Sequence, residues 1–351
     1  MDAKTLQNRH YLTDLFAGPF PGHAIVMDAP PREDYLAMRP YGDFALPHRP
    51  LSAWLPHLLW RYEDDLKWHE TTDDDSVPYV KLSTGTELFA AAFGCPVHVY
   101  DDSPPCALPL VTTAEEADRL QVPSLDAPPL ARVFEMARLV RERVGPETPI
   151  AVPDIQSAFD IAALIWRKED LFVAMLTQPD AVKRLVDKCQ QLLKTFFDHF
   201  LHEVGESNLC HCPVAWAPPE LGVWLSEDEA GSLSAPMFAE FCLPTLSDLS
   251  ATYGGLFLHC CATADHQYKN FAKIPDLRGL NRVFQKPGPG PAIETFSEQT
   301  VLMVAWTSEE KVYEMLDMAR PETRFLFNMG AQPLEESKRT YDRLRARCPR
   351  L

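Results

Sequence analysis

The chain has 351 residues, enough for one large α/β barrel or two ordinary domains, and 46% of them are hydrophobic. Its 50 acidic and 33 basic side chains give a formal net charge of −17, which disfavours binding to nucleic acid and to anionic membranes. No apolar run approaches the length that spans a bilayer, and the first residues lack the pattern of a signal peptide. We therefore expect a cytoplasmic protein whose 9 cysteines are reduced.

Short apolar runs that favour β-strands alternate along the chain with amphipathic stretches that favour helices. This alternation predicts parallel strands joined by right-handed crossovers. Eight such runs predict a single (β/α)8 barrel over residues 23–351, preceded by an N-terminal helical extension over residues 1–22. The predicted strands lie at residues 23–28, 77–82, 148–154, 208–214, 255–261, 277–281, 300–305 and 324–329.

The amphipathic stretches predict the helices of this barrel. The stretch at 179–205 begins with a proline and ends with a glycine, as helix boundaries often do. The stretch at 235–255 contains Pro244, which predicts a kink or a break. Further helices are predicted at 128–145 and 308–322. A doubly wound open sheet is the alternative fold, but no GxGxxG fingerprint follows any predicted strand, and no P-loop or GxSxG motif is present.

The apolar run at 255–261 ends in the letters LHCC, in which His259 and Cys261 are two residues apart. Because successive strand residues point to opposite faces, these two side chains face the same way and Cys260 faces the other. At the C-terminal end of a barrel strand they would line the mouth, where an imidazole and a thiol form half of a tetrahedral zinc site. The alternative is structural: His259 as a hydrogen-bonded core histidine, and the cysteines as small buried residues.

The preceding predicted strand ends in LCHCP, where Cys210 and Cys212 have the same spacing. Neighbouring strands lie about 4.8 Å apart, so either thiol would reach a metal held by His259 and Cys261. We therefore predict a zinc ion bound by His259, Cys261 and one of Cys212 or Cys210. The fourth position would stay open for a substrate thiol.

Other polar residues at or after predicted strand ends are candidates for catalysis. Asp154 closes the third predicted strand, and Asn281 closes the sixth. His266 follows the fifth predicted strand at the start of the next helix. We predict that these three residues act on the substrate. The alternatives are that Asp154 caps the following helix and that His266 is a solvated turn residue.

Three further residues are candidates for contact with a cofactor. Trp216 and Glu220 lie in the loop after the fourth predicted strand, and Asn328 lies near the end of the eighth. An aromatic wall and polar groups around a barrel mouth suit a bound organic group. Trp216 would fit the hydrophobic core equally well.

Four segments carry a resemblance to a known family: GTELFAAAFGCPV at 85–97, DIQSAFDIAALIW at 154–166, the stretch at 233–267 that contains LHCC, and IPDLRGLN at 274–281. In these segments the chain resembles the uroporphyrinogen decarboxylase superfamily, which includes corrinoid-dependent, zinc-binding methyltransferases. The resemblance implies a (β/α)8 barrel with the active site in its mouth.

Within this superfamily, the methyltransferases carry an H-x-C pattern and, much later, a further cysteine after a glycine on the last strand. His259 and Cys261 match the first part, but Ala331 follows Gly330 where that cysteine is expected. The resemblance thus implies methyl transfer between a corrinoid and a zinc-activated thiol. The corrinoid would be carried by a partner protein, and the substrate would be a small molecule.

Two alternatives remain open. One is decarboxylation of a tetrapyrrole, uroporphyrinogen III to coproporphyrinogen III, or of another carboxylate. The decarboxylases hold their substrate with an arginine-rich N-terminal motif, and no close match to it occurs among the scattered Arg32, Arg39, Arg49 and Arg61. The other alternative is a metal-free barrel that binds a small molecule or a partner without catalysis, and Ala331 favours it.

Overall fold

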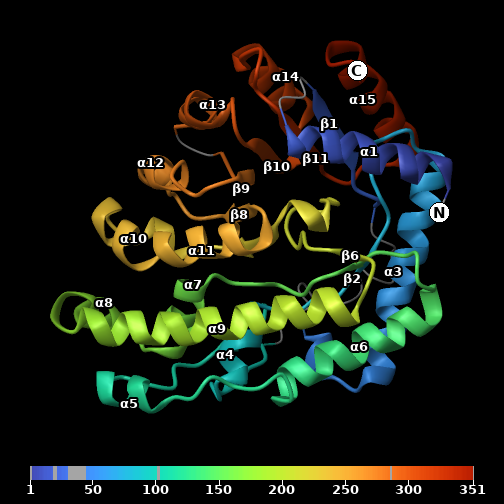
Figure 1. Cartoon of the computed structure of the whole chain (residues 1–351). Coiled ribbons are helices and arrows are strands. Elements are labelled where there is room, and N and C mark those ends of the chain that lie inside the picture. Colours follow the sequence, from blue (N-terminus) through green and yellow to red (C-terminus); the bar gives the residue numbers. More distant parts are fainter. Residues whose placement is uncertain (1, 19–21, 31–44, 101–102, 285–286, 351) are drawn as a thin grey trace.

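The computed structural model describes residues 2–18, 22–30, 45–100, 103–284 and 287–350. In these residues parallel strands form the centre of the molecule and helices pack outside them (Figure 1). The larger sheet has six strands in the order β1-β11-β10-β9-β8-β7. These strands are β1 (His23–Met27), β7 (Val223–Ser226), β8 (Leu256–Cys260), β9 (Leu277–Arg282), β10 (Val301–Thr307) and β11 (Phe325–Met329).

The smaller parallel sheet has three strands of two residues each, in the order β2-β5-β6. An isolated bridge between Gln156 and Ser226 joins the chain after β5 to the end of β7, so the two sheets meet there. The continuous ladders do not close a complete barrel within the described residues. The strands are β2 (Val80–Lys81), β5 (Ile150–Ala151) and β6 (Ser207–Asn208), and a separate hairpin pairs β3 (Val97–His98) with β4 (Cys106–Ala107).

Two aspartate side chains take the place of a neighbouring strand along the free edge of β1. The backbone N–H of Ile25 donates to Asp75 Oδ2 at 2.7 Å, and that of Met27 donates to Asp74 Oδ2 at 2.8 Å. The backbone N–H of Asp75 donates in turn to the carbonyl of Ile25 at 2.9 Å. Both carboxylates are fully buried, and Arg345 pairs with Asp75. Side chains therefore satisfy the edge that a β1–β2 ladder would otherwise satisfy.

Helices follow most strands and pack on the outside of the sheets (Figure 1). Pro244 has the expected effect, because one helix ends at Phe241 and the next begins at Leu243. In the described part of the chain, no helix has both the length and the apolar character needed to cross a membrane. The helices are α1 (Ala3–Ala17), α3 (Leu51–Thr71), α4 (Leu88–Ala92), α5 (Ala114–Arg119), α6 (Pro128–Val144), α7 (Ala158–Ile165), α8 (Lys168–Thr177), α9 (Pro179–Glu203), α10 (Ala235–Phe241), α11 (Leu243–Tyr253), α12 (Tyr268–Phe271), α13 (Gly290–Phe296), α14 (Glu309–Met318) and α15 (Leu334–Arg347).

The expected N-terminal helix is present as α1, and it packs against the sheet. The ring of Phe16 meets the ring of Phe257 on β8 edge to face, with 5.1 Å between the centroids. Arg324, just before β11, donates to the carbonyls of Leu15 and Gly18. These contacts lie toward the N-terminal ends of the strands, so α1 covers the end of the barrel opposite its mouth.

Each of the eight predicted runs overlaps an observed strand, although β6 shares only Asn208 with the run at 208–214, and this confirms the α/β class and the barrel-type order of strands. Three observed strands were not predicted: β3 and β4 of the hairpin, and β7, which lies between the LCHCP and LHCC segments. The premise that these two segments end consecutive strands is therefore wrong. The neighbour of β8 on that side is β7, with Ser226 in register with His259.

Candidate functional site

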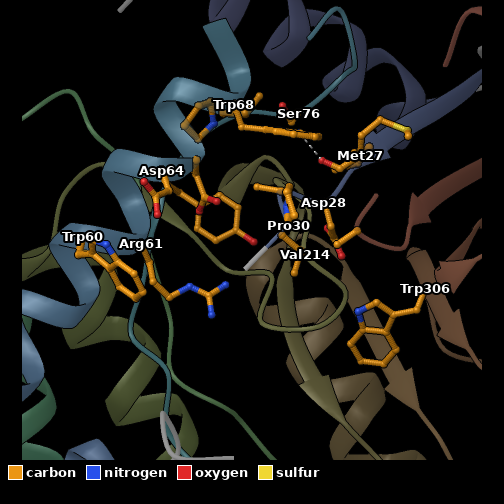
Figure 2. Close-up of a pocket in the computed structure, with 17 residues that line it drawn as sticks. Met27, Asp28, Pro30, Trp60, Arg61, Asp64, Trp68, Ser76, Val214 and Trp306 are labelled. Carbon is orange, nitrogen blue, oxygen red and sulfur yellow. Dashed lines mark hydrogen bonds between the residues drawn. The ribbon is translucent and has the colours of Figure 1, made fainter. Parts of the chain in front are cut away.

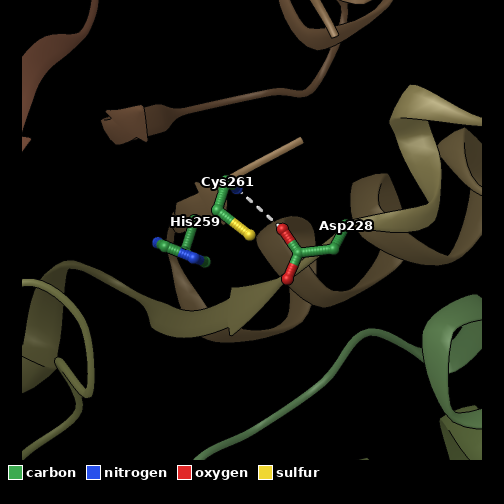
Figure 3. Close-up of side chains that lie close together, drawn as sticks. All are labelled: Asp228, His259 and Cys261. Carbon is green, nitrogen blue, oxygen red and sulfur yellow. Dashed lines mark hydrogen bonds between the residues drawn. The ribbon is translucent and has the colours of Figure 1, made fainter. Parts of the chain in front are cut away.

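A cluster of three possible metal ligands lies where β7 and β8 end. One ligand atom from each of Asp228, His259 and Cys261 lies within 4.8 Å of the others. Figure 3 shows the three side chains converging, with the backbone N–H of Cys261 donating to the Asp228 carboxylate. His259 and Asp228 are half-buried, and Cys261 is exposed. The cluster is thus reached from the C-terminal ends of the strands, where barrel enzymes have their active sites.

The close pairing of β7 and β8 brings the cluster together. The two strands are in parallel register from Val223 opposite Leu256 to Ser226 opposite His259. At their start, Gly222 and Gly255 have positive φ angles, and a Cβ on Gly222 would lie 2.2 Å from the carbonyl oxygen of Gly255. Only glycines allow this approach.

Asp228 is held in place by a carboxylate from α7. The backbone N–H groups of Asp228 and Glu229 donate to the two oxygens of Asp160, at 2.7 and 3.0 Å. Burial raises the pKa of Asp160 well above its ordinary value and that of the adjacent Glu227 to about 7. The turn after β7 is therefore fixed from behind, with Asp228 directed at the cluster.

The amide of Asn281 orients the imidazole of His259. Asn281 Nδ2 donates to the carbonyl of Met303 at 2.9 Å, which leaves Oδ1 to accept from His259 Nδ1 at 2.5 Å. With its proton on Nδ1, the neutral ring keeps the lone pair of Nε2 for a metal. Histidines that bind a metal usually donate their other ring N–H to such an acceptor, here Asn281 Oδ1.

Cys212 also contacts this cluster, from the loop after β6. Its Sγ lies 3.8 Å from Asn281 Oδ1, and it shares a side-chain hydrogen bond with His259. Burial lowers the pKa of His259, but hydrogen bonds with Cys212 and Cys261 and the charge of Asp228 outweigh burial, so the pKa lies well above its ordinary value. The cluster therefore favours a positive charge at its centre.

Asp154 lies near this cluster, and the buried side chain of His211 stands between Asp154 and His259. Its carboxylate accepts from Gln156 Nε2 at 2.8 Å and lies 3.6 Å from His211 Nε2, whose ring centroid is 6.4 Å from that of His259. Burial raises the pKa of Asp154 to about 6. The cap of α7 is Ser157, whose Oγ accepts from the Asp160 N–H at 3.0 Å, so the helix-capping alternative for Asp154 is wrong.

The structure places two other candidates outside this cluster. Cys210 is fully buried, and its Sγ donates to the carbonyl of Pro213 at 3.3 Å. His266 Nε2 bonds to the carbonyl of Leu233 at 2.8 Å. These contacts give Cys210 and His266 structural partners of their own, and neither is placed with the other ligands.

Cys260 points away from Cys261, as strand alternation predicts. It is fully buried, and the guanidinium of Arg282 donates to its Sγ at 3.3 Å. It therefore packs behind the strand and does not face the cluster.

The three predicted cofactor contacts lie apart from one another. Trp216 is buried beneath the guanidinium of Arg9 on α1, 5.1 Å from the ring centroid, toward the closed end of the barrel. Glu220 is exposed three residues before β7 begins, so it also lies at the N-terminal ends of the strands. Asn328 alone is at the mouth, where its Nδ2 donates to Asp28 Oδ1 at 2.7 Å. The first two positions do not fit a role in the mouth.

Sequence reasoning missed Asp228. It follows the four buried residues of β7, VWLS, which a glycine precedes and three acidic residues follow. An apolar run bounded in this way is a strand signal, but a run of four after a proline-rich loop is shorter than most predicted strands. Recognition of that run would have placed Asp228 at a strand end beside His259.

Comparisons with known proteins agree with this architecture. The family model described as uroporphyrinogen decarboxylase matches residues 80–281. No curated protein sequence matches the chain. A solved structure of a methyltransferase from Methanosarcina mazei has a similar fold, with a TM-score of 0.68, 16% identity, and coverage of 96% of this chain and 98% of that one.

A second solved structure is much less similar. It is the metallated form of a homocysteine methyltransferase from Escherichia coli, with a TM-score of 0.25, 10% identity, and coverage of 76% of this chain and 96% of that one. This low score carries no weight here.

The family match spans more than half of the chain and includes β7, β8 and Asn281, which orients His259. The chain therefore belongs to the uroporphyrinogen decarboxylase family.

Proposed function

We propose that the chain is a metal-dependent methyltransferase that acts on a thiol, with zinc bound by Asp228, His259 and Cys261. The observation that carries this proposal is the convergence of the three ligand atoms within 4.8 Å at the mouth. Cys212 is the fourth protein group at the cluster and can replace or support one of them. Asp228 and Cys212 would take the part of the cysteine expected at position 331, where this chain has Ala331.

The donor set suits zinc. Imidazole nitrogen, thiolate sulfur and carboxylate oxygen are the three ligand types that zinc takes in proteins. Sites with three protein ligands leave a position open for a substrate, as catalysis requires. The field that raises the pKa of His259 equally favours a cation in its place.

The residues of the chain have separate tasks in this proposal. A bound zinc ion would lower the pKa of a substrate thiol and so supply a thiolate nucleophile at neutral pH. Asn281 holds the ring of His259 in one tautomer and orientation, and Asp160 holds the backbone of Asp228. Asp154, with its raised pKa, lies on the far side of His211 and can exchange a proton near neutral pH.

The methyl donor in this proposal is a methylated corrinoid carried by a partner protein, and the acceptor is a small thiol. Reduced cysteine ligands fit the cytoplasmic location that the sequence predicts. Tetrapyrrole decarboxylation is not proposed, because carboxyl groups of Asp28, Asp64 and Asp65 line the cavity beside the cluster. These groups would repel a substrate with many carboxylates.

Metal analysis of the purified protein tests the proposal first. We expect about one equivalent of zinc per chain, and its loss in His259→Ala and Cys261→Ser. Cys106→Ser is the matched control, because Cys106 lies in the β3–β4 hairpin away from the cluster. The second test follows the absorbance of methylcobalamin in the presence of small thiols, where thiol-dependent demethylation should require bound zinc. A folded protein without zinc and without this activity would contradict the proposal and favour the non-catalytic barrel.

A further inference from the structure

A cavity of about 420 Å³ opens at the C-terminal end of β1, beside α3. Figure 2 shows it between Trp60 on one side and Trp306 on the other, with Asp28 and Arg61 directed into it. Its size lies in the range of small-molecule sites. The cavity thus has room for a ligand that the metal-binding cluster does not account for.

Aromatic rings form much of its wall. Trp60 and Trp68 come from α3, and Trp68 Nε1 donates to the carbonyl of Met27 at 2.9 Å, which fixes the ring. Trp306 lies where the register of β10 against β11 shifts, with φ at 48° and 64% of its surface exposed. Positive φ is unfavourable for a tryptophan, and a large exposed ring is uncommon on a barrel strand. The bulge therefore holds this ring out of the core and over the cavity.

Carboxyl groups outnumber cations among the described residues that line the cavity. Asp28, Asp64 and Asp65 contribute three carboxyl groups, and Arg61 contributes one guanidinium. Burial raises the pKa of Asp28 and that of Asp65 to about 6, so both are mainly ionised at neutral pH. Two partly desolvated carboxylates in one cavity gain energy from a positively charged ligand.

The hydroxyl of Tyr79 is a further indication that the cavity binds a ligand. It is buried at the cavity wall, and its hydroxyl has no hydrogen-bond partner among the residues that the structure describes. Buried hydroxyl groups in folded proteins are nearly always hydrogen-bonded. A polar group on a bound molecule would complete this contact.

The cavity adjoins the metal-binding cluster through the loop after β6. Cys212 contacts His259, and Val214, two residues later, lines the cavity. Two residues of extended chain span about 7 Å at most. One small molecule could therefore have one end in the cavity and the other near the cluster.

We propose that this cavity binds the ammonium group of a small organic cation, held by the faces of Trp60, Trp68 and Trp306 and by the carboxylates of Asp28 and Asp65. Aromatic faces together with carboxylates recognise alkylated ammonium ions through cation–π attraction and charge pairing. Binding in this cavity does not require the zinc proposed above. The net charge of −17 also favours the approach of a cation over that of an anion.

Calorimetric titration at neutral pH tests the proposal with three probes. Choline is the cation, 3,3-dimethylbutan-1-ol is its neutral counterpart of nearly the same shape, and acetate is the anion. We expect choline to bind with saturation and at least about tenfold more tightly than the neutral alcohol. Equal binding of the two would indicate a merely apolar cavity and would overturn the proposal. Preferential binding of acetate, or no saturable binding of choline, would overturn it as well.

Variants locate the binding. Trp306→Ala should weaken choline binding about fivefold to tenfold without disturbing the core, because this ring is exposed. Asp65→Asn should weaken it about tenfold, whereas Asp187→Asn, the same change on the exposed face of α9, should leave it unchanged. If Trp306→Ala and Asp65→Asn both bind choline as tightly as the native protein does, the cavity is not the binding site. Binding should persist in Cys261→Ser, so failure of the metal proposal would not remove this result.

Discussion

The two halves of the barrel wall are built in different ways. From β7 through β11 to β1, a continuous parallel ladder of backbone hydrogen bonds holds six strands. In the other half, β2, β5 and β6 have two residues each, and side chains close the gap next to β1. The metal-binding cluster lies on the ladder half, whereas the cavity lies where the two halves meet. A ladder shared by many bonds tolerates single substitutions better than an edge held by two aspartates.

Loss of Asp75 should cause the largest fall in stability, because this residue closes the side-chain half next to β1. Asp75→Ala leaves the Ile25 N–H without its acceptor and Arg345 without its buried partner. Uncompensated buried charges of this kind cost about 3–5 kcal/mol. We expect a fall of that size in the free energy of unfolding, measured by urea titration.

The control is Asp317→Ala, because Asp317 pairs with Arg347 at the surface, where both side chains are more than half exposed. Surface pairs of this kind contribute about 0–1 kcal/mol. Equal effects of the two substitutions would show that Asp75 does not seal the edge of β1.

The ladder half was the more predictable from the sequence. Its apolar runs alternate with amphipathic helices, and the i, i+2 spacing of His259 and Cys261 at a strand end correctly places both side chains together. The partners of His259 depend on register and loops. The adjacent strand β7 is short, and Cys212 reaches His259 from a loop that follows a two-residue strand. The four-residue run of β7 is only a weak strand signal, and the spacing of Cys210 and Cys212 does not show which of the two thiols faces His259.

In the half closed by side chains, the sequence predicted the strands and helices but not the contacts between them. The aspartates that accept from β1 lie about 50 residues from it in the sequence, in a stretch that reads as a polar loop. Likewise, the ring of Trp306 lies over the cavity because of a bulge, and strand alternation alone does not reveal a bulge. Tertiary contacts decide these features, and sequence periodicity does not report them.

Asn281 offers the next test, on the ladder half. Asn281→Ala removes the acceptor for His259 Nδ1 and frees the ring to rotate. Loss of such a partner lowers metal affinity about 10- to 100-fold. Competition with a chelator measures this affinity, and Asn281→Asp should restore most of it because an acceptor oxygen returns.

Asn270→Ala is the matched control for this substitution. Asn270 on α12 is also buried and also donates to a backbone carbonyl, but it does not contact His259. If both alanine variants lose metal to the same extent, general destabilisation explains the result, and Asn281 has no specific role.

Asp65 should make stability depend on pH. Burial raises its pKa in the folded chain to about 6, above the ordinary value of 3.8. The folded state therefore holds this proton more tightly, and stability from this group is greatest below about pH 4 and falls as the pH rises through about 6. Asn does not titrate, so we expect Asp65→Asn to become more stable relative to the native chain by about 1–2 kcal/mol between acidic and neutral pH.

Thermal unfolding at several pH values measures this difference. Asp187→Asn should show no such trend, because that side chain is exposed on α9. A difference between Asp65→Asn and the native chain that stays flat from about pH 5 to about pH 8 would contradict the prediction. In that case Asp65 is more hydrated than its burial implies, and it would attract a bound cation less strongly.

The smallest expected effect distinguishes the two cysteines of the LCHCP segment. Cys212 contacts His259 and Asn281, whereas Cys210 is fully buried with its thiol directed to the carbonyl of Pro213. Serine is a poorer zinc ligand than cysteine, so Cys212→Ser should lower zinc affinity severalfold. Cys210→Ser should leave affinity unchanged, since a hydroxyl can make the same hydrogen bond. The same chelator competition measures both, and a larger loss in Cys210→Ser would mean that the loop after β6 presents the other thiol to the metal.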